Sequence, residues 1–155
     1  MMYSAMIETY QTKKWIVRIK DLRKIAEEIK PLLIQQNPFI LWLRGGLGAG
    51  KTTFTAELLH VLGLPDRVPV LSPTYTFMTE YETTHGVMAH LDLYRLADGD
   101  DDSVEALLSG RKFAGLIIEW PERALDSSLI ASTHELHLFH GEADDQRIFE
   151  LRTPI

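Results

Sequence analysis

Phe39-Ile40-Leu41-Trp42-Leu43-Arg44-Gly45-Gly46-Leu47-Gly48-Ala49-Gly50-Lys51-Thr52 joins a short apolar run to the pattern G-x-x-x-x-G-K-[ST]. Residues 45–52 match the phosphate-binding P-loop, whose glycines let consecutive backbone N–H groups point at one phosphate. Lys51 can reach the β- and γ-phosphates of a nucleotide, and the Thr52 hydroxyl can bind Mg²⁺. The pattern therefore predicts a nucleotide phosphate site, and the alternative is a plain glycine-rich turn.

The sequence on both sides of the loop favours the P-loop over the turn. The run 39–43 is typical of a buried strand. After the loop, apolar residues recur at helical spacing: Phe54, Leu58, Leu59 and Leu62. Gly63 is placed to end that helix. A helix that starts at the loop directs its free N–H groups and its positive dipole end at a bound anion.

Composition restricts the class of protein. A length of 155 residues predicts a single domain, 1–155, with a sizeable core, and a 45% hydrophobic share is ordinary for a globular chain. A net charge of −6 argues against a surface devoted to nucleic acid. The absence of cysteine excludes disulfides and thiolate metal sites. Residues 1–10 carry no apolar leader and no run approaches the roughly 18 residues of a membrane span, so we expect a cytoplasmic protein.

Periodicity and turn signals predict the remaining elements. Strands are predicted at residues 15–19, 39–43, 76–82, 87–96, 113–118, 135–139 and 147–151. A helix is expected after Asp21 as its N-cap, and Pro31 should kink or end that helix. The acidic run at 100–103 should cap a short helix that lasts to Ser109. These elements predict an α/β chain: a P-loop NTPase-like three-layer fold with a mixed parallel/antiparallel sheet.

Two acidic residues are candidates for the carboxylates that nucleotide hydrolysis requires. The apolar strand ending at Glu119 would bring this acid near Thr52 if it ran parallel to the P-loop strand. Glu119 could then hold Mg²⁺ or orient the attacking water. Asp92 lies inside an apolar run, where an unpaired acid is costly to bury. Thr52, Asp92 and Glu119 would form an oxygen-rich Mg²⁺ site, and the alternative for each acid is a solvent-facing surface carboxylate.

Three further features could belong to the same site. Ser72-Pro73-Thr74-Tyr75-Thr76 is a hydroxyl-rich loop, which in P-loop proteins is often a switch that senses the γ-phosphate. A simple proline-containing loop is the alternative. Trp120 directly follows Glu119, where it could pack on a nucleotide or on the core. Histidines 134, 137 and 140 are three apart, a spacing that alternates faces in a strand, so a three-histidine metal site is not expected.

Four blocks in this order are more specific than the P-loop alone. They are LGAGKTT at 47–53, SPTYT at 72–76, HLDLYRL at 90–96 and IEWPER at 118–123. With them the chain resembles the TsaE family, the small bacterial P-loop ATPases of tRNA threonylcarbamoyladenosine biosynthesis. The resemblance covers residues 39–123 closely and the flanking sequence more loosely.

The resemblance implies a Mg²⁺-dependent ATPase that is weak alone and works with two partner proteins, a kinase-like-fold transferase subunit and its paralogue. These partners attach threonylcarbamoyl to adenosine 37 of tRNA, so this chain would meet tRNA through the complex. By resemblance, Glu119, Asp92 and Lys51 would be catalytic, and Thr52, Asp92 and Glu119 would bind the metal. The implied nucleotide contacts are Gly46, Leu47, Gly48, Ala49, Gly50, Lys51, Thr52, Thr53, Thr74, Thr76 and Trp120.

The chain departs from the family pattern at several positions. Gly46 stands where family members usually have an acid, but this position offers backbone to phosphate, so we expect binding to survive. The acidic helix after Leu96 aligns poorly, with Glu105 as its nearest match. Arg147 is a candidate for a late family arginine, and no nucleotide-contacting threonine is evident near Leu22.

Two other functions fit the P-loop. A small-molecule or nucleoside kinase could use the same Lys51 and Mg²⁺, but such kinases need an arginine-bearing lid. Only Arg111 and Arg123 occur between positions 98 and 126. The second alternative function is a scaffold protein that is gated by a bound nucleotide and does not hydrolyse it. A GTPase is disfavoured because N-K-x-D is absent, and the acidic charge argues against tight tRNA capture by this chain alone.

Overall fold

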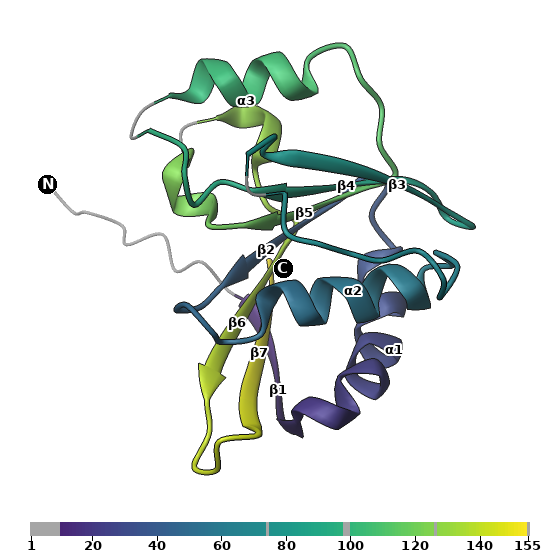
Figure 1. Ribbon diagram of the computed structural model, residues 1–155, viewed down its shortest axis with the longest axis vertical. Helices are drawn as coiled ribbons and strands as arrows, with labels where there is room; N and C mark the ends of the chain where they lie inside the picture. The colour runs from purple at the N-terminus through teal and green to yellow at the C-terminus, as the bar shows by residue number, and fades with distance from the viewer. Residues whose placement is uncertain (1–9, 74, 98–99, 126, 155) are drawn as a thin grey trace, which may run out of the picture.

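A computed structural model describes residues 10–73, 75–97, 100–125 and 127–154 (Figure 1). Its strands are β1 (Tyr10–Arg18), β2 (Phe39–Arg44), β3 (Met78–Thr83), β4 (Gly86–Asp92), β5 (Gly115–Glu119), β6 (His134–His140) and β7 (Gln146–Pro154). Its helices are α1 (Leu22–Leu33), α2 (Lys51–Val61) and α3 (Asp101–Leu108), with 3₁₀ turns η1 (Ile19–Asp21), η2 (Pro121–Arg123) and η3 (Ser128–Ile130).

The strands form one seven-stranded sheet in the order β1-β7-β6-β2-β5-β4-β3. Strand β2 pairs in parallel with both β5 and β6, and β4 pairs in parallel with β5. The β1–β7, β6–β7 and β3–β4 pairs are antiparallel. The predicted mixed sheet is therefore confirmed, and the parallel β2–β5 pair brings the end of β5 beside the P-loop.

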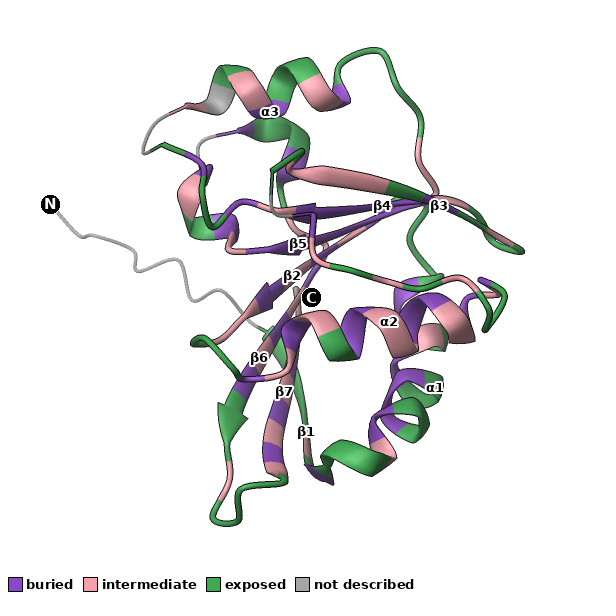
Figure 2. Ribbon diagram, in the orientation of Figure 1, coloured by how far each residue is buried: buried purple, intermediate pink, exposed green. Residues whose placement is uncertain are grey.

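Helices cover both faces of the sheet and make three layers (Figure 1). On one face, Leu41 and Ile117 belong to the core cluster that includes Phe54 of α2 and the buried side of α1. On the other face, Leu116 packs in a second cluster with Val104 of α3. Figure 2 shows the buried residues concentrated along the central strands and on the sheet-facing sides of the helices. Among the helices of the described residues, none has the length and apolarity that a membrane span requires.

Two predicted strand boundaries are wrong by four residues or more. The first strand begins earlier than position 15, because its whole length from Tyr10 pairs with β7. The strand predicted to run to Leu96 ends at Asp92. There the Asp92 carboxylate accepts a hydrogen bond from the Tyr94 N–H at 3.0 Å, a side-chain turn that ends the extended conformation. This early end leaves Asp92 at the edge of the sheet next to the P-loop.

The helix boundaries follow the predicted signals with two differences. Asp21 occupies the N-cap position of α1, but its side chain makes no capping hydrogen bond. Helix α1 passes through Pro31 and ends at Leu33, within the same turn. Asp100 caps α3 as predicted, because its side chain accepts the Ser103 N–H.

Gly63 ends α2 at a φ of 105°, and a Cβ there would lie 2.8 Å from the backbone nitrogen of Thr84. Gly110 has a φ of 73° but open space around it, so Gly110→Ala is a matched control. We expect Gly110→Ala to lower the free energy of unfolding by about 1–2 kcal/mol through backbone strain alone. Gly63→Ala should cost about 1–3 kcal/mol more because the turn must also shift. Urea unfolding measures both, and equal losses would contradict the contact with Thr84.

Candidate functional site

The P-loop connects the end of β2 to the start of α2 through glycines in left-handed conformations. Gly48 has a φ of 75°, and Gly50, the N-cap of α2, has a φ of 104°. Only glycine adopts such angles without a steric penalty. The turn leaves the first N–H groups of α2 without partners inside the helix, so they and the helix dipole form an anion site.

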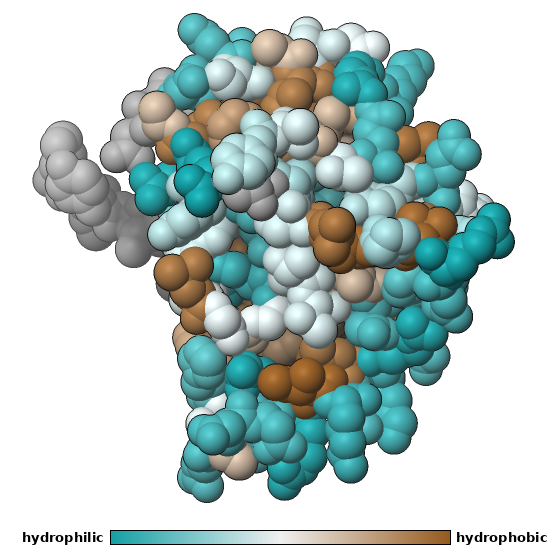
Figure 3. All heavy atoms as spheres, in the orientation of Figure 1, coloured by the Kyte–Doolittle hydropathy of each residue, from teal (hydrophilic) through white to brown (hydrophobic). Residues whose placement is uncertain are grey.

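A cavity of about 350 Å³ opens at this end of α2. That volume is within the roughly 300–1,000 Å³ of small-molecule sites. Its lining residues are Leu47, Gly48, Ala49, Gly50, Lys51, Thr52, Thr53, Ser72, Asp92, Tyr94, Glu119 and Trp120. On the face seen in Figure 3, residues of near-neutral hydropathy gather along the middle, and apolar surface lies in separate patches around them.

Lys51 is turned back onto the protein. Its Nζ donates a hydrogen bond to the Gly45 carbonyl at 2.6 Å and lies 3.5 Å from the centroid of the Trp120 ring. Burial lowers the pKa of Lys51, and the carboxylates of Glu119, Glu122 and Asp92 partly offset this effect. The hydrogen bond from Lys51 thus goes to a carbonyl rather than to a carboxylate, and its charge is available to an anion in the cavity.

Trp120 owes its place over Lys51 to an uncommon backbone conformation. Its φ is 58° and its ψ is 50°, a left-handed geometry that costs free energy in a bulky residue. The ring also contacts Tyr94, with ring centroids 4.9 Å apart. The strain at Trp120 therefore places an aromatic wall next to the P-loop lysine.

The predicted oxygen ligands converge on one corner of the cavity. The Thr52 hydroxyl donates to Glu119, with both carboxylate oxygens 3.1 Å away. Asp92 is in register with Glu119 on the neighbouring strand and accepts a hydrogen bond from the Ser72 hydroxyl. A hydroxyl and two carboxylates are hard oxygen donors, a set that fits Mg²⁺. These residues could hold the ion together with phosphate oxygens and water.

The other predicted nucleotide contacts do not all line the cavity. Gly46 is exposed and outside the cavity lining, although its carbonyl accepts the Ala49 N–H at 3.2 Å. Thr76 is exposed, and its hydroxyl donates to the Met78 carbonyl at 3.3 Å. Thr74 lies outside the described residues. Two lining residues, Ser72 and Tyr94, were not predicted as site residues, although both belong to the sequence blocks quoted above.

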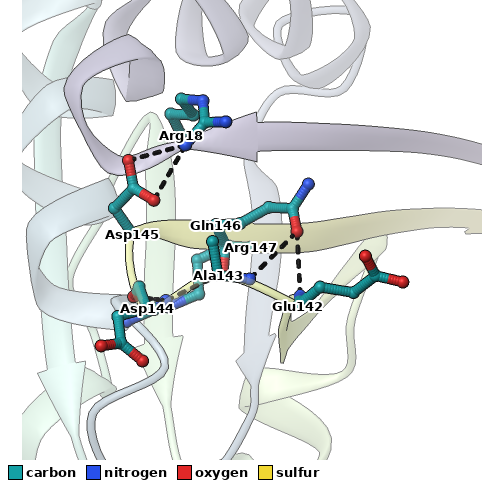
Figure 4. A network of polar contacts seen from close by, with 7 residues as sticks. All are labelled: Arg18, Glu142, Ala143, Asp144, Asp145, Gln146 and Arg147. Carbon is teal, nitrogen blue, oxygen red and sulfur yellow. Dashed lines mark hydrogen bonds and ion pairs between the residues drawn. The ribbon is translucent and has the colours of Figure 1, made fainter.

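Arg147 also reaches the P-loop, from the start of β7. It is 8% exposed, and its guanidinium donates to the carbonyls of Asp144 at 2.6 Å and Gly48 at 3.4 Å. Figure 4 shows the β6–β7 turn around it, held also by the ion pair between Arg18 and Asp145. Arg147 therefore ties this turn to the phosphate loop. The family resemblance offered Arg147 as a candidate for a late arginine, but the local sequence did not predict its contact with Gly48.

Trp120 should report on nucleotide binding. A Lys51 side chain that binds phosphate would have to leave the indole ring of Trp120, so we expect added Mg²⁺ and ATP to change tryptophan emission. Trp120→Phe should remove most of the change. Trp15→Phe is the control, since Trp15 lies on β1 and donates to Glu28. A nucleotide-dependent change that survives in Trp120→Phe would contradict this assignment.

Comparison with known proteins identifies what this chain is similar to. A family model described as "Threonylcarbamoyl adenosine biosynthesis protein TsaE" matches residues 16–149. The chain is 42% identical over 107 residues to the tRNA threonylcarbamoyladenosine biosynthesis protein TsaE of Aquifex aeolicus, covering 67% of this chain and 72% of that protein. It is 36% identical over 102 residues to the protein of the same name from Haemophilus influenzae, covering 65% and 63%.

Among solved structures, the fold is similar to that of YdiB from Bacillus subtilis. The TM-score is 0.66 at 22% sequence identity, and the match covers 95% of this chain and 88% of that one. At this identity the likeness concerns the fold, and it agrees with the mixed sheet and its flanking helices.

Proposed function

The chain belongs to the TsaE family, and from this premise we propose that it binds and hydrolyses ATP with Mg²⁺ in support of tRNA threonylcarbamoyladenosine biosynthesis. We propose that it does so as one P-loop domain. We also propose that it acts in the cytoplasm.

One observation carries the proposal: a buried lysine, a threonine hydroxyl and two strand-end carboxylates line a single cavity at a helix N-terminus. Each is the residue type that nucleotide hydrolysis requires at that place. Lys51 and the N–H groups of α2 provide positive charge for phosphate. Thr52, Asp92 and Glu119 provide oxygens for the cation.

We assign the roles of the chain's own residues accordingly. Lys51 leaves the Gly45 carbonyl and the Trp120 ring to bind the β- and γ-phosphates. Bound Mg²⁺ would supply charge neutralisation for the phosphates. Glu119 accepts a hydrogen bond from the attacking water and orients it. Burial of Glu119, which is 3% exposed, keeps bulk water from competing for that position.

The loop after α2 is proposed as the nucleotide sensor. Ser72 holds the Asp92 carboxylate, so a cation that binds Asp92 would compete with this hydrogen bond. The loop could then take a different position with and without nucleotide, which is how P-loop switches respond. The roles of Thr74 and Thr76 in this switch are part of the proposal.

We propose two partners, the transferase subunit of the threonylcarbamoylation complex and its paralogue. They would bind the tRNA and carry out the transfer, while this chain supplies the nucleotide cycle. The net charge of −6 supports this assignment, because an acidic chain is not expected to bind the tRNA phosphates tightly by itself.

The test is ATP hydrolysis by the purified chain with Mg²⁺, alone and with both partner subunits and tRNA. We expect slow turnover alone and faster turnover in the complex, with loss of both when Mg²⁺ is chelated. Turnover that ignores the partners, or phosphate transfer to added nucleosides or sugars, would contradict the proposal. Tight ATP binding without hydrolysis in the complex would favour a nucleotide-gated scaffold instead.

A further inference from the structure

A fully buried histidine lies directly against the proposed catalytic carboxylate. His90 of β4 is 0% exposed, and its Nε2 lies 2.6 Å from Oε2 of Glu119. His90 is in register with Ile117 of β5, two residues before Glu119, so both side chains are on the face that α2 covers. His90 is not among the residues that line the cavity, and it reaches the site through its hydrogen bond to Glu119.

The hydrogen bond to Glu119 accounts for a histidine at this buried position. The other ring nitrogen, Nδ1, is buried and has no hydrogen-bond partner among the described residues. Burying an imidazole costs free energy unless it is hydrogen-bonded, and an apolar side chain would avoid that cost. The hydrogen bond to Glu119 offsets this cost, so the carboxylate accounts for the histidine at position 90.

The same bond makes the two oxygens of Glu119 unequal. Thr52 bonds to both oxygens at 3.1 Å, which leaves the rotation of the carboxylate undetermined. The terminal torsion of a glutamate is intrinsically broad. The bond from His90 involves Oε2 alone, so it fixes this oxygen toward β4 and leaves Oε1 for the cavity.

We propose that His90 is a positioning residue, which holds the Glu119 carboxylate in the orientation that nucleotide hydrolysis needs. The inference rests on the proposed function of Glu119. An ionised carboxylate only accepts hydrogen bonds, so Nε2 carries the proton and donates it.

The hydrogen-bond state of His90 is tested without nucleotide or metal. A ring ¹⁵N–¹H correlation spectrum of the full chain should show a proton on Nε2 of His90, in the hydrogen bond to Glu119. Glu119→Gln should shift that proton signal, whereas Glu122→Gln should leave it in place. A proton found on Nδ1 instead would overturn the proposal, since Nε2 could then not donate to Glu119.

The catalytic consequence is tested by substitution. His90→Leu removes the donor at similar volume, and we expect kcat for ATP to fall about 10- to 100-fold, the usual loss when such an outer hydrogen bond is removed. ATP affinity in EDTA should stay nearly unchanged, because His90 does not touch the cavity. His90→Gln can place an amide N–H near the position of Nε2 and should restore much of kcat.

His134→Leu is the control for a merely structural role. His134 is 2% exposed, lies on β6 and hydrogen-bonds to Thr133 rather than to the site. If His90 were only structural, both leucine variants would lose activity in proportion to lost stability, and His90→Gln would not restore kcat. If wild type and His90→Leu hydrolyse ATP equally fast, the positioning proposal fails while the proposed function stands. If the wild type does not hydrolyse ATP with its partners, the proposed function fails, and the spectrum still decides the hydrogen bond.

Discussion

Lys51→Ala is expected to weaken ATP binding at least about 100-fold, a loss of roughly 3 kcal/mol. The physical reason is that Lys51 is a buried cation facing the cavity, and it is proposed to meet the phosphates directly. Its removal should not unfold the protein, because a buried ammonium carries a desolvation cost that alanine avoids. Isothermal calorimetry with Mg²⁺ and ATP measures the affinity, and urea unfolding measures the stability.

Lys112→Ala is the matched control for this experiment. Lys112 is exposed and outside the cavity lining, so its loss should leave ATP affinity unchanged. If Lys51→Ala bound ATP as tightly as the wild type, the P-loop of this chain would not be its nucleotide site.

Glu119→Gln should lower kcat for ATP about 100- to 10,000-fold, the range for loss of a group that handles the reacting proton or water. Glutamine keeps the volume and one oxygen but loses the negative charge. ATP should still bind, because the phosphates are proposed to contact Lys51 and the start of α2. Single-turnover hydrolysis and calorimetry separate the two effects.

Glu122→Gln controls for the general loss of one negative charge near the site. Glu122 is exposed and does not line the cavity, but its negative charge partly offsets the effect of burial, which lowers the pKa of Lys51. We expect wild-type turnover from this variant. A Glu119→Gln protein that turns over ATP normally would show that another group orients the water.

The part of the site that local sequence could predict is the part built from contiguous residues. The P-loop, the strand before it and the helix after it follow from a motif and from apolar spacing. The strand ending in Glu119 could be predicted because an apolar run ends in an acid. Its place next to Thr52 required only that this strand be parallel to β2.

The contacts that were not predicted join distant parts of the chain. His90 and Glu119 are 29 positions apart and meet because β4 and β5 are neighbours in the sheet. Arg147 contacts Gly48 across 99 positions, through the turn between β6 and β7. No periodicity within one strand encodes which strand lies next to it.

The boundary of β4 was missed for a local reason. Apolar alternation continues past Asp92, so the pattern favours a longer strand. The hydrogen bond from Tyr94 N–H to the Asp92 side chain competes with that pattern and ends the strand. This turn brings both Asp92 and Tyr94 into the cavity lining.

We propose that the ATP cycle of this chain drives repeated rounds of tRNA modification by its partners. The most direct measurement is multiple-turnover formation of threonylcarbamoyladenosine on tRNA by the two partner subunits, with this chain omitted, added as wild type, or added as Glu119→Gln. We predict sustained product formation with the wild type, and little beyond a single turnover without it or with the variant. Equal product yields in all three reactions would contradict the account.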